Sequence, residues 1–161
     1  MTRFFAKRMI LSFILCCLAM TNVWAQEYSI TSGGQGKNGR YLVRVTLKTK
    51  AKKSELNAED LLKRYAVHGV MFRGVASTEG FGEQKPLVSD PNLEQVKSDF
   101  FNAFFAEESY KRYASIVDTS MSSTKLSKKT YEVTALLLVD KESLQNYLEK
   151  SGIIEGFSNL W

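Results

Sequence analysis

Two segments of this chain alternate apolar and polar residues along nearly their whole length, and this alternation limits the fold more than any other feature. In residues 40–48, RYLVRVTLK, the apolar positions on one side are Tyr41, Val43, Val45 and Leu47. In residues 130–140, TYEVTALLLVD, they are Tyr131, Val133, Ala135, Leu137 and Val139. Because successive side chains of a strand point to opposite faces, the spacing predicts two strands, each buried on one face.

Three segments have the spacing of amphipathic helices. The first covers residues 57–68, with Asn57 as its cap and Gly69 placed to end it in a left-handed conformation. The second begins at Asp90 and Pro91, a cap followed by proline at the first helical position, and runs through the phenylalanine-rich stretch to residue 108. The third covers residues 141–150.

The remaining segments complete a βαβαββα order. Residues 70–77, VMFRGVAS, read as a strand parallel to the first through a right-handed crossover. Residues 112–120 read as a third strand, joined to the strand at 130–140 by a solvated hairpin loop and pairing with it antiparallel. The predicted fold class is α+β, a two-layer sandwich with about four strands in a mixed sheet and three helices mainly on one face.

The first 25 residues have the layout of a secretory signal peptide. Arg3, Lys7 and Arg8 precede the apolar run MILSFILCCLAM, and TNVWA follows it. The run is shorter than the ~20 residues that span a bilayer, which favours a cleaved signal over an amino-terminal anchor. We predict cleavage after Ala25 and a periplasmic or secreted protein with no transmembrane span.

Cleavage also changes the chemistry of the chain. It removes both cysteines, Cys16 and Cys17, which excludes cysteine chemistry. It leaves 19 basic and 17 acidic residues, a balance that gives no reason to expect a nucleic-acid partner. Residues 26–39, which contain SGGQGKNG but not a P-loop, are predicted to be a flexible lead. Residues 40–161 are predicted to form a single domain.

His68, the sole histidine, is the first candidate for acid–base chemistry. A hydrolase would need a serine and an acid beside it, and a zinc site would need further ligands. The sequence has no second histidine and no nucleophile-elbow motif. We therefore expect no enzyme, no metal and no cofactor, and interpret His68 as the end of a helix; a hydrolase using His68 is the least favoured alternative.

Two surfaces are candidates for binding. Lys48, Lys50, Lys52 and Lys53 fit either envelope-lipid phosphates or, as we favour, the solvated end of a strand. In residues 77–90, a loop longer than most, Phe81 is a candidate ligand contact together with Tyr110.

The helix after Pro91 has an apolar arc wider than one sheet face requires. If Phe100 and Phe104 face the sheet, Phe101 and Phe105 must be covered by the loop, by the carboxyl tail with Trp161, or by another protein. Leu42, Leu136 and Leu138 on the opposite sheet face suggest a further cover, either the lead or a second copy in a homo-oligomer.

The stretch YAVHGVMFRGVAS, residues 65–77, after such a signal peptide resembles small uncharacterised exported proteins of Bacteroides-type bacteria. The resemblance implies an envelope location and no site residues. The leading hypothesis is a non-enzymatic envelope module that binds another protein through Phe101 and Phe105. The alternative is a small-molecule or glycan-binding domain that uses the 77–90 loop.

Overall fold

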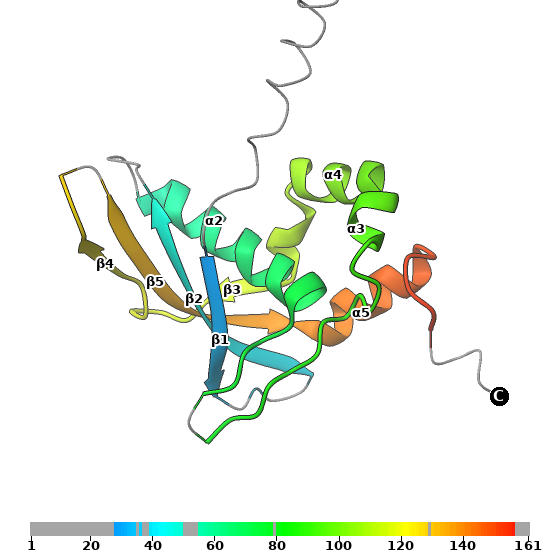
Figure 1. Ribbon diagram of the computed structural model, residues 1–161, viewed down its shortest axis with the longest axis horizontal. Coiled ribbons are helices and arrows are strands. Elements are labelled where there is room, and N and C mark those ends of the chain that lie inside the picture. The colour runs from blue at the N-terminus through cyan, green and yellow to red at the C-terminus, as the bar shows by residue number, and fades with distance from the viewer. Residues whose placement is uncertain are drawn as a thin grey trace, which may run out of the picture.

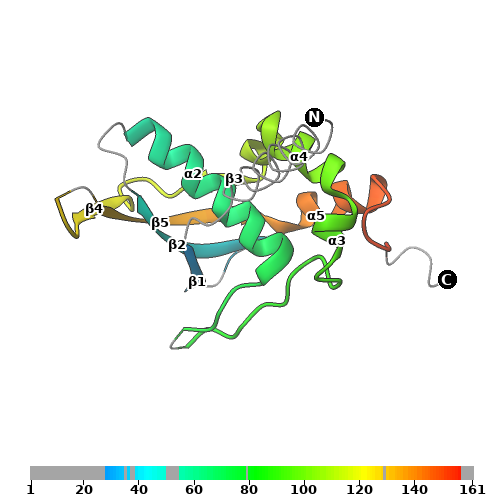
Figure 2. The ribbon, with the colours of Figure 1, turned by 45° about the horizontal axis from the view of Figure 1, so that its top comes forward.

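The computed structural model describes residues 28–34, 36, 39–49, 55–78, 80–128 and 130–156. These residues form an α+β fold in which an open antiparallel sheet of five strands carries its helices on one face (Figures 1 and 2). The α+β class predicted from the sequence is confirmed, whereas the numbers of strands and helices are not. The predicted mixed sheet is wrong, since every pair of neighbouring strands is antiparallel.

The sheet is built around two long central strands. These are β2 (Arg40–Thr49) and β5 (Tyr131–Asp140), which pair over their full length from Arg40 opposite Asp140 to Thr49 opposite Tyr131. β1 (Tyr28–Gly34) pairs with the free edge of β2. β3 (Ala114–Ile116) and β4 (Ser122–Lys125) share the other edge of β5, β3 near its end and β4 near its start. The two strands predicted from alternation are confirmed.

The helices form a single layer on one face of the sheet. α2 (Glu55–His68) crosses the sheet and continues directly into a π-helix, Gly69–Arg73. α3 (Leu93–Val96) and α4 (Ser98–Ala106) precede a 3₁₀ turn at Ser109–Arg112, and α5 (Lys141–Lys150) follows β5. The side chain of Asp140 caps α5 by accepting a hydrogen bond from the Ser143 N–H at 3.0 Å. Among the described residues there is no helix that combines the length and apolarity needed to cross a membrane.

The strand predicted at residues 70–77 is wrong. Gly69 does not turn the chain, and the helix carries on as a π-helix until Gly74, whose φ of 74° is a positive value that favours glycine. Val70 and Met71 are buried in it, and their carbonyls accept hydrogen bonds from Leu87 N–H at 3.1 Å and Val88 N–H at 2.9 Å. A short apolar run fits a buried helix as well as a buried strand, and here the helix forms.

The lead predicted over residues 26–39 contains an edge strand, β1. Tyr28, Ile30 and Ser32 point into the protein and are buried. Ile30 lies so close to Gly69 that a Cβ on this glycine would come within 2.8 Å of the Ile30 Cδ1 atom. β1 pairs antiparallel with β2, where the sequence predicts no strand. The hairpin loop predicted after residue 120 likewise contains a strand, β4.

Candidate ligand-binding cleft

His68 lies at the end of α2 between two hydrogen-bond partners. Its Nδ1 is 2.7 Å from the Tyr28 hydroxyl oxygen, and its Nε2 is 3.0 Å from Glu94 Oε1. Since a carboxylate can only accept, Nε2–H donates to Glu94 and Nδ1 accepts from the tyrosine hydroxyl. The three residues join α2, β1 and α3. In the described residues the hydrogen-bond partners of the ring are Tyr28 and Glu94, so the hydrolase arrangement with a serine is not assembled at His68.

The surroundings of His68 and Tyr28, which we call the His68 junction, favour the neutral form of both side chains. Burial lowers the pKa of His68, an effect that the neighbouring Glu94 carboxylate partly offsets. Burial also raises the pKa of Tyr28, so its phenol remains protonated and is not activated as a nucleophile. A neutral imidazole held between a phenol and a carboxylate is well suited to joining secondary-structure elements.

The junction predicts a pH dependence of stability. Because the pKa of His68 is lower in the folded state, the unfolded chain binds this proton first as the pH falls below about 6.5. The contribution of His68 should be complete above that value, decline on acidification and level off once the folded imidazole is protonated. The measurement is the free energy of unfolding of the wild type minus that of His68→Gln between pH 8 and pH 5. A difference that grows on acidification contradicts the assignment.

The aromatic residues of α4 are covered from inside the protein. Phe101 and Phe105 are only 2% and 4% exposed. The Phe101 ring packs edge-on against Phe72 at 4.8 Å between centroids, and Phe105 packs against Tyr110 at 5.9 Å. On the other side of α4, Phe104 packs against Tyr147 of α5 at 5.7 Å. The wide apolar arc is therefore explained by a helix that has neighbours on two sides.

These positions decide what the candidate surface can contact. Phe101, Phe105 and Tyr110 are inside the core, so they offer no docking surface in this structure. Trp161 lies outside the described residues, as do Lys50, Lys52 and Lys53 and the predicted signal peptide. Phe81 is 38% exposed and separate from the other aromatic residues, on the segment after Gly74.

That segment folds into an irregular hairpin beside β1 (Figure 1). The hairpin is closed by hydrogen bonds between Val75 and Gln84 in both directions, at 2.8 and 2.9 Å, and between Thr78 and Phe81 at 3.1 and 2.9 Å. It is tied to β1 where the Ser32 N–H donates to the Ala76 carbonyl at 2.9 Å. The Thr78 hydroxyl also donates to the Ser32 carbonyl at 3.0 Å. These bonds fix the hairpin against the sheet edge.

A cleft of about 470 Å³ lies between this hairpin and the start of β2. Its volume falls in the range of small-molecule sites. Two aromatic rings line it, Phe81 from the hairpin and Tyr41 from β2. The Tyr41 hydroxyl accepts a hydrogen bond from Lys141 Nζ at 2.5 Å, which fixes the ring. The remaining lining is polar or lacks a side chain: Ser32, Gly34, Gly36, Gly39, Arg40, Gly80, Gly82, Glu83 and Gln84.

Gln84 carries the one buried side-chain oxygen or nitrogen without a hydrogen-bond partner in the described part of the chain, Oε1. Leaving such an atom unpaired costs about 1–3 kcal/mol, so native proteins retain few of them. Gln84 is also a lining residue of the cleft. Gln84 and the exposed Phe81 thus line the same cleft, and the unpaired Oε1 lies buried behind its surface.

A larger cleft of about 640 Å³ lies between residues 85–90 and α5. Leu87, Leu93, Ile153 and Ile154 are among its lining residues, and its charged groups, Lys85 and Lys141 against Asp90 and Glu155, balance. It contains neither an exposed aromatic ring nor an unpaired buried acceptor. The cleft at Phe81 is therefore the better candidate site.

The sequence pointed to part of this cleft. The sequence predicts Phe81 and the 77–90 loop as candidates, whereas it places Tyr41 only on a buried strand face and gives no signal for Arg40 or Gln84. The two glycine-rich turns, before residue 40 and around residue 81, lie close together because β1 pairs with both β2 and the segment at Ala76. A strand prediction for residues 28–34 would have been the signal for this. Comparisons with protein families, curated proteins and solved structures find no significant match to this chain.

Proposed function

We propose that this chain is an exported, non-enzymatic module that binds a small polar ligand of the sugar type in the cleft at Phe81. The observation that carries the proposal is that Gln84, whose buried Oε1 has no partner, lines the same cleft as the exposed ring of Phe81. The export step rests on the amino-terminal sequence, and the absence of enzymatic activity rests on the lack of a catalytic constellation around His68.

The cleft chemistry favours a sugar over a purely apolar ligand. The C–H face of a sugar ring can pack on the exposed face of Phe81, while its hydroxyls reach polar groups around the ring. Gln84 Oε1 is buried, so a ligand hydroxyl can donate to it only once the Gln84 amide turns towards the cleft; that bond then removes the cost of the unpaired oxygen. Arg40 as a donor and Glu83 as an acceptor lie at the exposed rim. Gly80 and Gly82 leave open space where a Cβ atom would stand.

The hypothesis of a protein-binding module depends on Phe101 and Phe105 as an exposed surface, and both residues are buried. Another envelope protein as partner stays a hypothesis without an assigned surface.

Replacing Gln84 tests the role of the unpaired oxygen. Gln84→Met keeps the length of the side chain and removes the acceptor, so we expect the free energy of unfolding to rise by about 1 kcal/mol and saccharide binding to be lost. The control is Gln95→Met at an exposed position of α3, which should alter neither. The measurements are urea unfolding and calorimetric titration. A Gln84→Met variant that is less stable, or that binds as the wild type does, counts against the assignment.

A further inference from the structure

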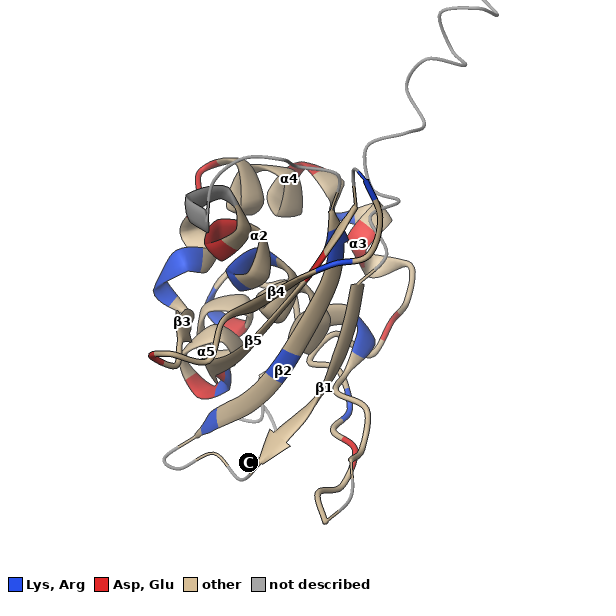
Figure 3. Ribbon diagram, turned by 90° about the vertical axis from the view of Figure 1, so that its left-hand side faces the viewer, with Lys and Arg blue, Asp and Glu red and all other residues tan. Residues whose placement is uncertain are grey.

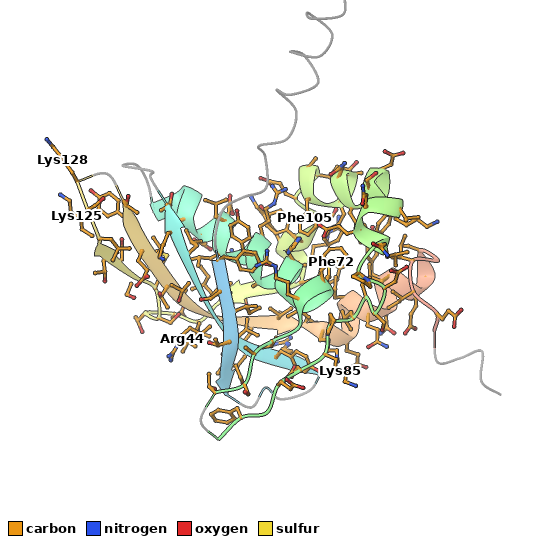
Figure 4. The ribbon with its side chains drawn as sticks, in the orientation of Figure 1. Arg44, Phe72, Lys85, Phe105, Lys125 and Lys128 are labelled. Carbon is orange, nitrogen blue, oxygen red and sulfur yellow. The ribbon has the colours of Figure 1, made fainter. Side chains whose placement is uncertain are left out.

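The β4–β5 hairpin is a ribbon that projects from the end of the sheet (Figures 1 and 4). All four residues of β4, Ser122–Lys125, are exposed. The turn is closed where Leu126 N–H and Ser127 N–H both point to the Thr130 carbonyl, at 2.9 and 3.2 Å. In Figures 1 and 2 the end of the ribbon projects beyond the described helices.

The tip of the ribbon is basic. Lys125 and Lys128 are exposed and point outward from it (Figure 4), and Figure 3 shows blue segments of the ribbon close to β4. Between residues 119 and 131 the sequence contains no acidic residue. Glu132 comes next, and it lies directly opposite Lys48 of β2 in the strand register. Glu132 belongs to the ribbon as well, opposite Thr124 of β4, so the two exposed lysines outnumber one acid and the tip keeps a net positive charge.

An exposed aliphatic residue lies between the two lysines. Leu126 is 49% exposed and is one of four large apolar residues in the described chain with comparable exposure. Lysines on an edge strand can serve to prevent pairing with another sheet. That role gives no reason to place a leucine in the turn, whereas a tip that enters the headgroup region of a membrane needs both positive charge and an apolar side chain.

We propose that the tip formed by Lys125, Leu126 and Lys128 docks on the surface of an anionic phospholipid bilayer. The ammonium groups interact with the lipid phosphates while Leu126 enters the headgroup boundary. The ligand cleft lies at the other end of β2, beside Arg40, and the ten residues of this strand place it roughly 30 Å from the tip. A docked chain would hold its cleft open to the aqueous side. This inference does not depend on the ligand proposed for the cleft.

The test is cosedimentation with vesicles of phosphatidylcholine alone or with about one third phosphatidylglycerol. It uses the chain in the form that cells produce, with its N-terminus defined by mass spectrometry. We expect binding only to the anionic vesicles, and loss of this binding when salt is raised from about 0.05 M to about 0.5 M. Lys125→Gln/Lys128→Gln should lower the affinity roughly 20-fold, since each lysine near such a surface contributes about fivefold. Adding Leu126→Ser to this double variant should lower the affinity for anionic vesicles further.

The matched control is Lys97→Gln/Lys150→Gln, which removes the same charge from exposed positions on other elements. It should change the affinity less than twofold. Inorganic phosphate added at constant ionic strength should not compete, because no single phosphate is bound. Equal losses in the two double variants, equal binding to neutral vesicles, or competition by phosphate would each overturn the proposal. Since saccharide binding is measured without vesicles, failure here leaves the cleft proposal standing, and the reverse also holds.

Discussion

Phe105→Ala should lower the free energy of unfolding by about 3–5 kcal/mol, the range for a buried phenylalanine. Phe105 is 4% exposed and its ring contacts those of His68, Phe104 and Tyr110 at centroid distances of 5.9, 5.1 and 5.9 Å. Truncation therefore leaves a cavity where α2, α4 and the 3₁₀ turn meet. Urea unfolding followed by circular dichroism measures the loss.

Phe81→Ala is the matched control, since it makes the same substitution at a residue that is 38% exposed. It should cost less than about 1 kcal/mol of stability and should abolish saccharide binding. If Phe105→Ala retained full stability but lost a protein partner, Phe105 would be a docking residue. The present assignment of Phe105 to the core would then be wrong.

Ile30→Ala should lower the free energy of unfolding by about 2–5 kcal/mol. Ile30 is buried in β1 and packs against the backbone at Gly69. If residues 28–34 were a flexible lead, the substitution would cost almost nothing. Ser29→Ala, at the adjacent exposed position of the same strand, should change stability by less than about 0.5 kcal/mol. Equal and small effects of the two substitutions would contradict the placement of β1 in the sheet.

The parts of the fold that could be predicted are those in which one local pattern dominates. β2 and β5 alternate over ten residues, and α5 has both a clear cap at Asp140 and one apolar stripe. β1 has the same alternation at Tyr28 and Ile30, which indicates a strand. The alternation is short and runs into glycines, and the composition of residues 26–39 indicates a flexible lead instead. β1 is stabilised by contacts that are not local: the pairing with β2, the packing of Ile30 at Gly69 and the hydrogen bond between Tyr28 and His68.

The error at residues 70–77 has a different cause. Val70 and Met71 are apolar neighbours, and such a pair is compatible with any element that is buried on several sides. The π-helix places both side chains in the core, and their backbone carbonyls accept hydrogen bonds from the N–H groups of Leu87 and Val88. This tertiary pairing, which the sequence pattern does not reveal, selects helix over strand. It also positions the hairpin that forms one wall of the cleft.

The candidate site could be predicted only in part for a similar reason. An exposed phenylalanine in a long loop suggested a surface, and the hairpin at Phe81 confirms that the segment is exposed. The other wall comes from Arg40 and Tyr41, which are distant in sequence and meet the hairpin only through β1. The unpaired oxygen of Gln84 depends on the packing around a single amide, and no sequence pattern encodes that.

The most direct test of the central claim is a titration of the ¹⁵N-labelled protein with pentose, hexose and N-acetylhexosamine saccharides. We predict that at least one of them shifts the amide signals of Ser32, Gly34, Arg40, Phe81 and Gln84, and that Gln84→Met removes these shifts. The account would be contradicted if no saccharide in the panel shifted any of these signals. Shifts confined to α4 and the aromatic residues around His68 would contradict it as well.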